Sequence, residues 1–177
     1  GAMIGLRCSK KRAENLLEKV EHYAILANIN SPRQVVIAGE KRAIKQISIL
    51  ATKAGIPAYR LAVSGAFHTK LVTEAANAIK KVTLLPPVLT EPSCQIYRGM
   101  DGSEIKSGRI LRDYFSDQVL TPVYFTSLVQ SMSENCDLFI EVGPGQALSG
   151  MINDVNGGTG PLCLPVESTP GRDRDIN

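Results

Sequence analysis

Several features that would assign this 177-residue chain to a common class of protein are missing from its sequence. No stretch approaches the roughly 18 consecutive apolar residues of a membrane-spanning helix. The chain does not open with a basic stretch followed by an apolar one, so no signal peptide is expected. The four cysteines, Cys8, Cys94, Cys136 and Cys163, form no CxxC pair and have no histidine at ligand spacing, which argues against a metal site and a disulfide framework. We therefore expect a soluble, cytoplasmic protein with reduced thiols and no membrane partner.

Aromatic residues are also scarce, at 5% of the chain, and the net charge is a mild +3. Ferredoxin-like RNA-binding domains stack bases on aromatic residues of their strands, a pattern that this sequence lacks. A nucleic-acid partner is therefore not expected. The hydrophobic content of 44% and the charged content of 21% are ordinary for a globular protein. The length permits one domain, or two small subdomains that share a core.

The first third of the chain predicts a ferredoxin-like subdomain. Short apolar segments alternate with segments whose apolar residues recur at helical spacing, in the order βαββαβ. Ser9 is a candidate N-cap for the first helix, and Gly55 with Pro57 closes the second. The expected elements are strands at 3–6, 23–29, 34–38 and 58–63, helices at 9–20 and 40–54, and a turn at Asn30-Ser31-Pro32.

The remainder of the chain alternates strands, turns and helices in a way that predicts part of an α/β sheet. We expect helices at 69–81, 107–119 and 123–133, a strand or extended segment at 88–97 after the proline-rich residues 85–87, and a turn at 100–102. Strands are expected at 138–142 and 162–166, with a short helix between them. The polar residues 167–177 are typical of a linker or a frayed end. The predicted boundaries are 1–63 for the small subdomain, 64–166 for part of a larger one, and 167–177 for the tail.

His68 is the first candidate for chemistry, because it lies where a strand gives way to a helix, and such junctions expose side chains. Imidazole is the commonest general base near neutral pH, but a lone histidine also serves as a hydrogen-bonded structural residue. Gly143-Pro144-Gly145 follows an apolar strand and precedes a helix. That turn is compatible with a phosphate-binding loop, although a structural turn that closes the strand explains it as well.

Four separated segments, in the same order, resemble one family. They are Asn30 to Gly39 (NSPRQVVIAG), Gly65-Ala66-Phe67-His68, Gln118 to Val123 (QVLTPV), and Ile140 to Gly145 (IEVGPG). The family is that of the malonyl-CoA:acyl carrier protein transacylases and the acyltransferase domains of polyketide synthases. The resemblance implies an α/β fold, more closely α+β, in which the ferredoxin-like subdomain is followed by the C-terminal part of an α/β hydrolase-like subdomain.

The resemblance also implies an activity. In the family, a serine in a Gly-His-Ser-x-Gly elbow takes a malonyl group from coenzyme A and passes it to the phosphopantetheine thiol of an acyl carrier protein. His68 would be the general base, and Gln118 would orient the His68 ring through its backbone carbonyl. No cofactor would be bound permanently, because malonyl-CoA is a substrate and the phosphopantetheine belongs to the carrier protein. The other interpretation of Gln118 is an ordinary residue at a helix end.

Two more residues have both a binding and a structural interpretation. In the family, a phenylalanine before the histidine accompanies a preference for malonyl over methylmalonyl units, and Phe67 stands at that position. A ring there would crowd an α-methyl group, a discrimination worth only about 1–3 kcal/mol; alternatively Phe67 is part of the core. Asn30 would line the substrate pocket, or would simply form a turn.

The nucleophile of the family has no counterpart in this sequence, because no serine stands in a Gly-x-Ser-x-Gly motif. In the family, the elbow precedes the ferredoxin-like part, so the resemblance covers only the later part of the family's domain. We expect the chain alone to be inactive and to need the N-terminal half or neighbouring synthase domains as a partner. The alternative is a non-catalytic remnant that serves as a structural or docking module within a multidomain synthase.

Overall fold

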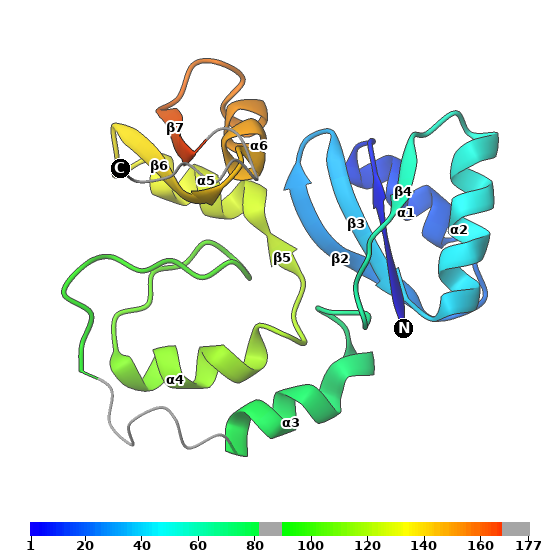
Figure 1. Ribbon diagram of the computed structural model, residues 1–177, viewed down its shortest axis with the longest axis horizontal. Helices are drawn as coiled ribbons and strands as arrows, with labels where there is room; N and C mark the ends of the chain where they lie inside the picture. Colours follow the sequence, from blue (N-terminus) through cyan, green and yellow to red (C-terminus); the bar gives the residue numbers. More distant parts are fainter. Residues whose placement is uncertain (82–89, 168–177) are drawn as a thin grey trace, which may run out of the picture.

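The computed structural model describes residues 1–81 and 90–167. Two groups of elements are joined by α3, α4 and β5, as Figure 1 shows. The first group comprises β1 (Ala2–Leu6), α1 (Lys10–Leu17), β2 (Ala24–Ser31), β3 (Gln34–Gly39), α2 (Lys41–Lys53) and β4 (Ala58–Arg60). The later elements are a 3₁₀ helix (Lys70–Val72), α3 (Thr73–Lys81), α4 (Gly108–Asp117), β5 (Val123–Tyr124), α5 (Phe125–Ser133), β6 (Leu138–Pro144), α6 (Ala147–Asn156) and β7 (Leu162–Glu167).

The first group has the predicted ferredoxin-like arrangement. Its strands lie in the order β4-β1-β3-β2, with antiparallel neighbours, and β5 adds a parallel strand beside β2. Both helices pack on one face of the sheet, where Leu6, Ile37 and Ile47 are completely buried or nearly so. The expected βαββαβ order is confirmed, because the apolar residues of α1 and α2 recur at the spacing that a helix needs to bury one face.

The β2–β3 hairpin differs from the prediction in the position of its turn. Asn30 and Ser31 belong to β2, and Ser31 pairs with Gln34, so the turn residues are Pro32 and Arg33 rather than Asn30 to Pro32. The Ser31 hydroxyl accepts a hydrogen bond from the Arg33 amide at 3.2 Å. The proline ring presets the backbone angle that such a turn requires, so the turn centres on Pro32 and not on the asparagine.

Other differences concern the ends of elements. The helix expected at 123–133 begins two residues later, because Val123 and Tyr124 form β5. The strand expected at 58–63 ends at Arg60, and residues 90–97 of the expected extended segment form no strand apart from a single bridge between Tyr97 and Glu104. The rest of that segment, the proline-rich residues 85–87 and most of the expected tail, 168–177, lie outside the described residues. Glu167 belongs to β7.

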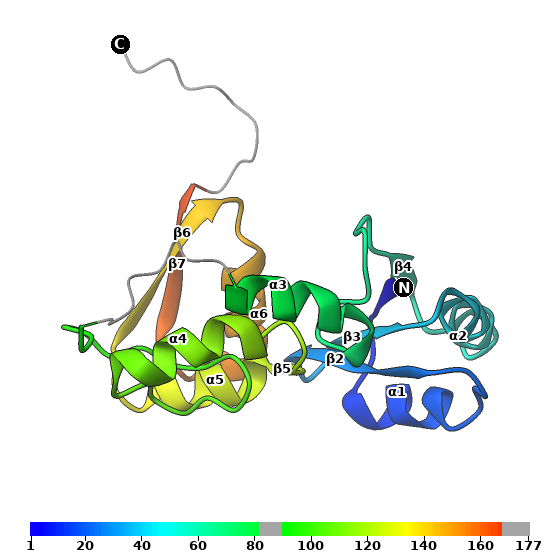
Figure 2. The ribbon, with the colours of Figure 1, turned by 90° about the horizontal axis from the view of Figure 1, so that it is seen from below.

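The last group packs α5 and α6 against a parallel pair of strands, β6 and β7. The inner face of the pair is closed by Phe139 and Cys163, which pack against Val129 of α5 and Ile152 of α6. The outer face is exposed and apolar, and Figure 2 shows α6 on one side of the strand pair only. Six side chains, between 44% and 86% exposed, form this outer face: Leu138, Ile140, Val142, Leu162, Leu164 and Val166.

Within residues 1–81 and 90–167, no helix has the length and apolar character that crossing a membrane requires.

Candidate active site

His68 lies between two buried residues of the same loop, Ala66 and Thr69. Ala66 is 1% exposed and packs, with Phe67, on the sheet face opposite α1 and α2, while Thr69 is completely buried. The Thr69 hydroxyl donates to the Ala66 carbonyl at 2.7 Å and accepts from the Leu71 amide at 3.1 Å. Thr69 therefore caps the 3₁₀ helix and also closes the loop around His68, so the backbone of His68 has little freedom.

The backbone of His68 has a positive φ of 62°, the only such value among the described residues other than glycine. A residue with a Cβ atom is strained in this left-handed region by about 1–2 kcal/mol. The His68 amide donates to the Val119 carbonyl at 2.8 Å, which helps to hold the strained conformation. Strain of this kind persists where the surroundings fix it, and such places are often functional.

The imidazole ring of His68 faces two backbone carbonyls. Its Nδ1 atom lies 2.8 Å from the Gln118 oxygen and 3.1 Å from the Thr121 oxygen. Because a carbonyl oxygen can only accept a hydrogen bond, Nδ1 must carry the proton, and Nε2 of the neutral ring keeps its lone pair. The ring is half-buried, so it is held in one orientation and one tautomer, with Nε2 as the basic atom.

These carbonyls belong to the turn that follows α4. The Gln118 amide continues the helical pattern by donating to Tyr114 at 3.0 Å, and the Leu120 amide and the Thr121 hydroxyl both donate to the Asp117 carbonyl at 3.0 Å. The turn therefore presents the C-terminal end of α4 to His68.

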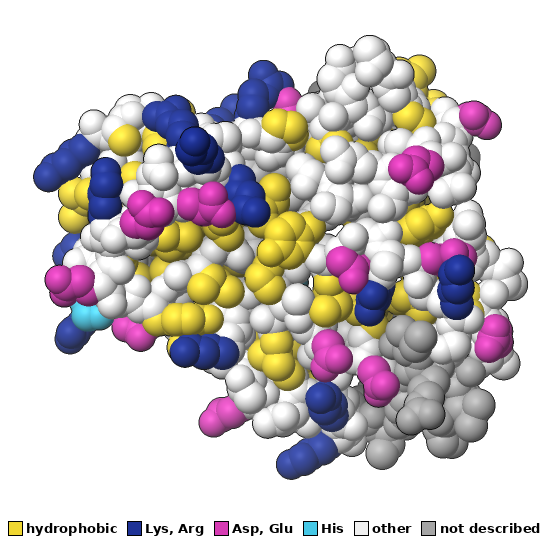
Figure 3. Space-filling model, turned by 180° about the vertical axis from the view of Figure 1, so that it is seen from behind, with side chains coloured by type: hydrophobic (Ala, Val, Ile, Leu, Met, Phe, Trp, Pro, Cys, Tyr) yellow, Lys and Arg dark blue, Asp and Glu magenta, His cyan; other side chains and the backbone are white. Residues whose placement is uncertain are grey.

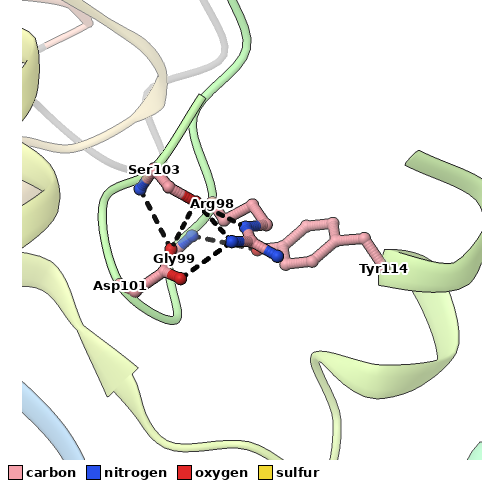
Figure 4. A network of polar contacts seen from close by, with 5 residues as sticks. All are labelled: Arg98, Gly99, Asp101, Ser103 and Tyr114. Carbon is pink, nitrogen blue, oxygen red and sulfur yellow. Dashed lines mark hydrogen bonds and ion pairs between the residues drawn. The ribbon is translucent and has the colours of Figure 1, made fainter. Parts of the chain in front are cut away.

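A polar network in the loop at 98–103 anchors α4 and β5 on either side of that turn (Figure 4). Arg98 donates to Ser103 at 2.7 Å and to Asp101 at 2.8 Å, which keeps the loop closed. The Gly99 amide donates to the Tyr114 hydroxyl at 3.1 Å, and the Gly99 carbonyl accepts from the Tyr124 amide at 2.8 Å. Sequence reasoning missed this network, because its members are polar residues in no periodic pattern and Tyr114 lies 15 residues from Gly99 in the sequence.

The sequence-predicted residues are thus partly brought together. His68 and Gln118 are in contact through the Gln118 backbone, which is the contact that the resemblance implies. Phe67 is half-buried against Met3, Ala27, Val36, Ala38 and Ala66. Asn30 is half-buried at the end of β2, and in the described part of the chain no hydrogen bond joins it to His68. The catalytic and binding roles of these residues stay predictions.

Neither a nucleophile nor a metal site accompanies His68 in the described residues. His68 has no hydrogen bond to a serine hydroxyl there, and no group of three or more His, Cys, Asp or Glu side chains is placed to hold a metal ion. The arrangement can therefore accept and return a proton at Nε2.

The turn at 143–145 is structural rather than a phosphate cradle. The Glu141 side chain, in a residue that is 8% exposed, accepts from the Leu148 amide at 3.0 Å, from the Ser149 amide at 2.8 Å and from the Ser149 hydroxyl at 2.6 Å. The Ser149 hydroxyl, together with these amides, outweighs burial and lowers the pKa of Glu141. The first N–H groups of α6 are therefore already satisfied by a carboxylate of the same chain.

Comparison with known sequences shows relatives of one kind, although no family model matches the chain. The malonyl CoA-acyl carrier protein transacylase of Bacillus subtilis is 32% identical over 133 residues, which are 74% of this chain and 42% of the relative. That of Haemophilus influenzae is 32% identical over 160 residues, 88% of this chain and 50% of the relative. The chain thus spans about half the length of the transacylases it matches.

Solved structures of the same kind share the fold. The transacylase of Xanthomonas oryzae matches with a TM-score of 0.83 and 26% identity, over 94% of this chain and 54% of that one. The acyltransferase domain from the second module of the salinomycin polyketide synthase matches at 0.79 and 25%, over 94% and 39%. A malonyl-transacylase solved in complex with its type II polyketide acyl-carrier protein matches at 0.81 and 25%, over 95% and 55%.

Proposed function

This chain belongs to the family of malonyl-CoA:acyl carrier protein transacylases and polyketide synthase acyltransferase domains, and on that premise we propose that it supplies the general base of a malonyl transferase. The donor would be malonyl-CoA and the acceptor the phosphopantetheine thiol of an acyl carrier protein. The observation that carries the proposal is the His68 ring, held by two backbone carbonyls with Nε2 left basic. No resident cofactor is needed for this chemistry.

The chemistry runs in two balanced steps. In the first, a serine hydroxyl gives its proton to His68 Nε2 while its oxygen attacks the malonyl thioester, and the imidazolium returns the proton to the departing coenzyme A thiolate. In the second, the carrier thiol gives its proton to Nε2, attacks the acyl-serine ester, and the serine oxygen leaves with that proton. Gln118 and Thr121 orient the ring through their backbone carbonyls.

Substrate contacts are assigned to Phe67 and Asn30. Phe67 directly precedes His68, and its ring is fixed by packing on the sheet, so an α-methyl group on the acyl chain would meet a surface that cannot yield easily. The resulting preference for malonyl over methylmalonyl is about 1–3 kcal/mol. Asn30 lies at the end of β2, beside Ile29, which pairs with β5 just after the Gln118–Thr121 turn.

The serine would come from the half of the family's domain that this chain does not span. The exposed outer face of β6 and β7 supports this proposal, because parallel strands are almost always covered on both faces. Ile140 is 62% and Val142 86% exposed, whereas Phe139 and Glu141 on the inner face are buried. A further segment, encoded in the same or another polypeptide, would cover this face and bring the serine to His68. The chain alone would then be inactive.

A chimeric enzyme tests the base. The segment of the Bacillus subtilis transacylase that matches this chain is replaced by the chain, and malonyl transfer from coenzyme A to a carrier protein is measured. His68→Ala should reduce kcat by roughly 10²–10⁴-fold. His22→Ala is the matched control, because His22 lies on the first subdomain beside Glu40 and should leave the rate unchanged.

The alternative function, a non-catalytic structural or docking module, makes the opposite prediction. Full activity of the chimera after His68→Ala would establish the alternative and overturn the base assignment. Malonyl transfer by the purified chain alone would instead refute the claim that the nucleophile lies outside it. In either case the four free cysteines fit a reducing compartment, and we place the protein in the cytoplasm.

A further inference from the structure

A second candidate site lies away from His68. A cavity of about 810 Å³ opens between the start of α1, the tip of the β2–β3 hairpin and the first part of α6. Its charged lining consists of three arginines, Arg7, Arg12 and Arg33, and one carboxylate, Asp154. Phe67, His68 and Gln118 do not line it. The cavity is thus separate from the proposed base and carries an excess of two positive charges.

The one carboxylate is already neutralised. Asp154 accepts two hydrogen bonds from Arg33, one of them at 2.7 Å from Nε. Burial alone would raise the pKa of Asp154, but the hydrogen bonds from Arg33 and Ser31 and the charge of Arg33 outweigh it and lower the pKa. Asp154 therefore stays ionised and is matched by Arg33, so it does not compensate the other two arginines.

The other two guanidinium groups have no anionic partner within residues 1–81 and 90–167. The Arg12 side chain donates to the Ala54 carbonyl at 3.2 Å, and the Arg7 side chain has no hydrogen bond or ion pair among the described residues. The charge of Arg12 acts on the cavity wall, because it opposes the rise that burial causes in the pKa of Cys8, another lining residue. Two arginines thus act on one cavity, and the part of the chain that the structure describes offers them no counter-charge.

The cavity adjoins a strongly basic part of the molecule. Residues 1–60 contain eleven lysines and arginines against four acidic residues, and residues 61–177 contain nine against thirteen. Figure 3 shows both signs of charge over each part of the molecule, with dark blue side chains more frequent over the ferredoxin-like subdomain. A separation of charge of this kind attracts anions toward the basic half before any specific contact forms.

We infer that this cavity binds the phosphate groups of an anionic ligand. The planar fork of a guanidinium group matches a phosphate with two parallel hydrogen bonds, and Arg7 and Arg12 line one cavity with no carboxylate partner among the described residues. The volume falls within the range of small-molecule sites. The amides at the start of α6 cannot contribute, because Glu141 occupies them, so Arg7 and Arg12 would carry the binding.

The natural source of these phosphates would be the nucleotide portion of coenzyme A, which is the one element of this inference that rests on the proposed function. Free inorganic diphosphate offers the same chemistry. The two sources are distinguished by comparing coenzyme A with pyrophosphate, and the phosphate requirement is tested with pantetheine and malonate, which carry no phosphate.

The experiment measures binding of these four compounds to the purified chain by titration calorimetry, without any assay of catalysis. The Arg7→Gln/Arg12→Gln variant should weaken pyrophosphate binding by about tenfold or more, because it removes two charge-assisted contacts to phosphate oxygens. Lys41→Gln/Lys45→Gln is the matched control. It removes the same two charges from the same subdomain, at exposed positions of α2 outside the cavity, and should change the affinity by less than about twofold.

Each result supports or overturns the inference. Equal losses of pyrophosphate affinity in the two double variants would show diffuse electrostatic attraction and would overturn the proposed site. The site would also be overturned if malonate bound as tightly as pyrophosphate, or if pyrophosphate did not bind at all. Tighter binding of coenzyme A than of pyrophosphate would assign the site to the coenzyme, and equal binding would assign it to free phosphates; both support the phosphate class. Unchanged thermal unfolding shows that a variant is folded, and loss of malonyl transfer in the chimera would leave these results standing.

Discussion

Lysine substitutions on the outer face of β6 should have opposite consequences in two contexts. Val142 is 86% exposed and Ile140 is 62% exposed, so in the isolated chain either side chain contributes little to folding. Replacing one with lysine should change the free energy of unfolding of the isolated chain by less than about 0.5 kcal/mol. If the other half of the family's domain covers this face, as proposed above, the same substitution buries an ammonium group and removes apolar contact.

The magnitude follows from burial. Covering a valine or isoleucine side chain completely contributes about 1.5–3 kcal/mol, and burying a charge without a partner adds a further penalty. The chimera described above, which contains both halves, should therefore lose at least about 3 kcal/mol on Val142→Lys, where the isolated chain loses almost nothing. Urea unfolding of the chain and of the chimera, with and without the substitution, gives both differences directly.

The control is Ile49→Lys, since Ile49 is also exposed, at 50%, but lies on α2 of the ferredoxin-like subdomain. It should be tolerated in both contexts. The reasoning would be refuted by a Val142→Lys variant that unfolds with an equally small change in the chain and in the chimera, because the outer face would then be solvent-exposed in the complete domain as well.

Two further predictions concern residues that position the site and the second group of elements. Thr69→Val removes a completely buried hydroxyl that donates to Ala66 and accepts from Leu71, and should lower the free energy of unfolding by about 1–3 kcal/mol. The control is Thr73→Val at an exposed position, which should lower the free energy of unfolding by less than about 0.5 kcal/mol. Equal effects of the two substitutions in denaturant titrations would contradict the role of Thr69. Glu141→Gln should destabilise the chain at pH 7, because the carboxylate accepts the hydrogen bonds at the start of α6. The pKa of Glu141 in the folded chain lies below its ordinary value, so the difference in free energy of unfolding between variant and wild type should shrink as the pH falls below about 4.3. Unfolding measured from pH 7 to pH 3 tests this, and a difference that stays constant would refute it.

Much of the first subdomain could be predicted from sequence, because its elements are defined by local signals. Apolar residues at helical spacing marked α1 and α2, and Ser9 is the N-cap of α1, with its hydroxyl 3.5 Å from the Arg12 amide. The strands alternate with these helices at short intervals, so their order alone indicates the ferredoxin-like arrangement. The hairpin turn was misplaced, since Asn30 and Pro32 both favour turns and local preference could not choose between them.

The features that sequence reasoning missed depend on long-range pairing. β5 has only two residues, and Val123 is apolar and lies just before a helix, so nothing local distinguishes it from the first turn of α5. It becomes a strand because Asn28 and Ile29 of β2 pair with it. The positive φ of His68 is equally invisible in the sequence, because glycine rather than histidine usually signals that conformation.

The contacts that orient the His68 ring determine which substitutions would disturb it. In many catalytic triads the base is oriented by a carboxylate side chain, which one substitution removes, whereas here the two acceptors are backbone carbonyls that every residue possesses. Changing the side chain of Gln118 leaves its carbonyl in place. What must be preserved is the course of the turn after α4, and Tyr114 fixes it twice, through its carbonyl to the Gln118 amide and through its hydroxyl to the Gly99 amide. The orientation of the His68 ring therefore depends more on the Tyr114 hydroxyl, which does not touch the ring, than on the side chain of Gln118.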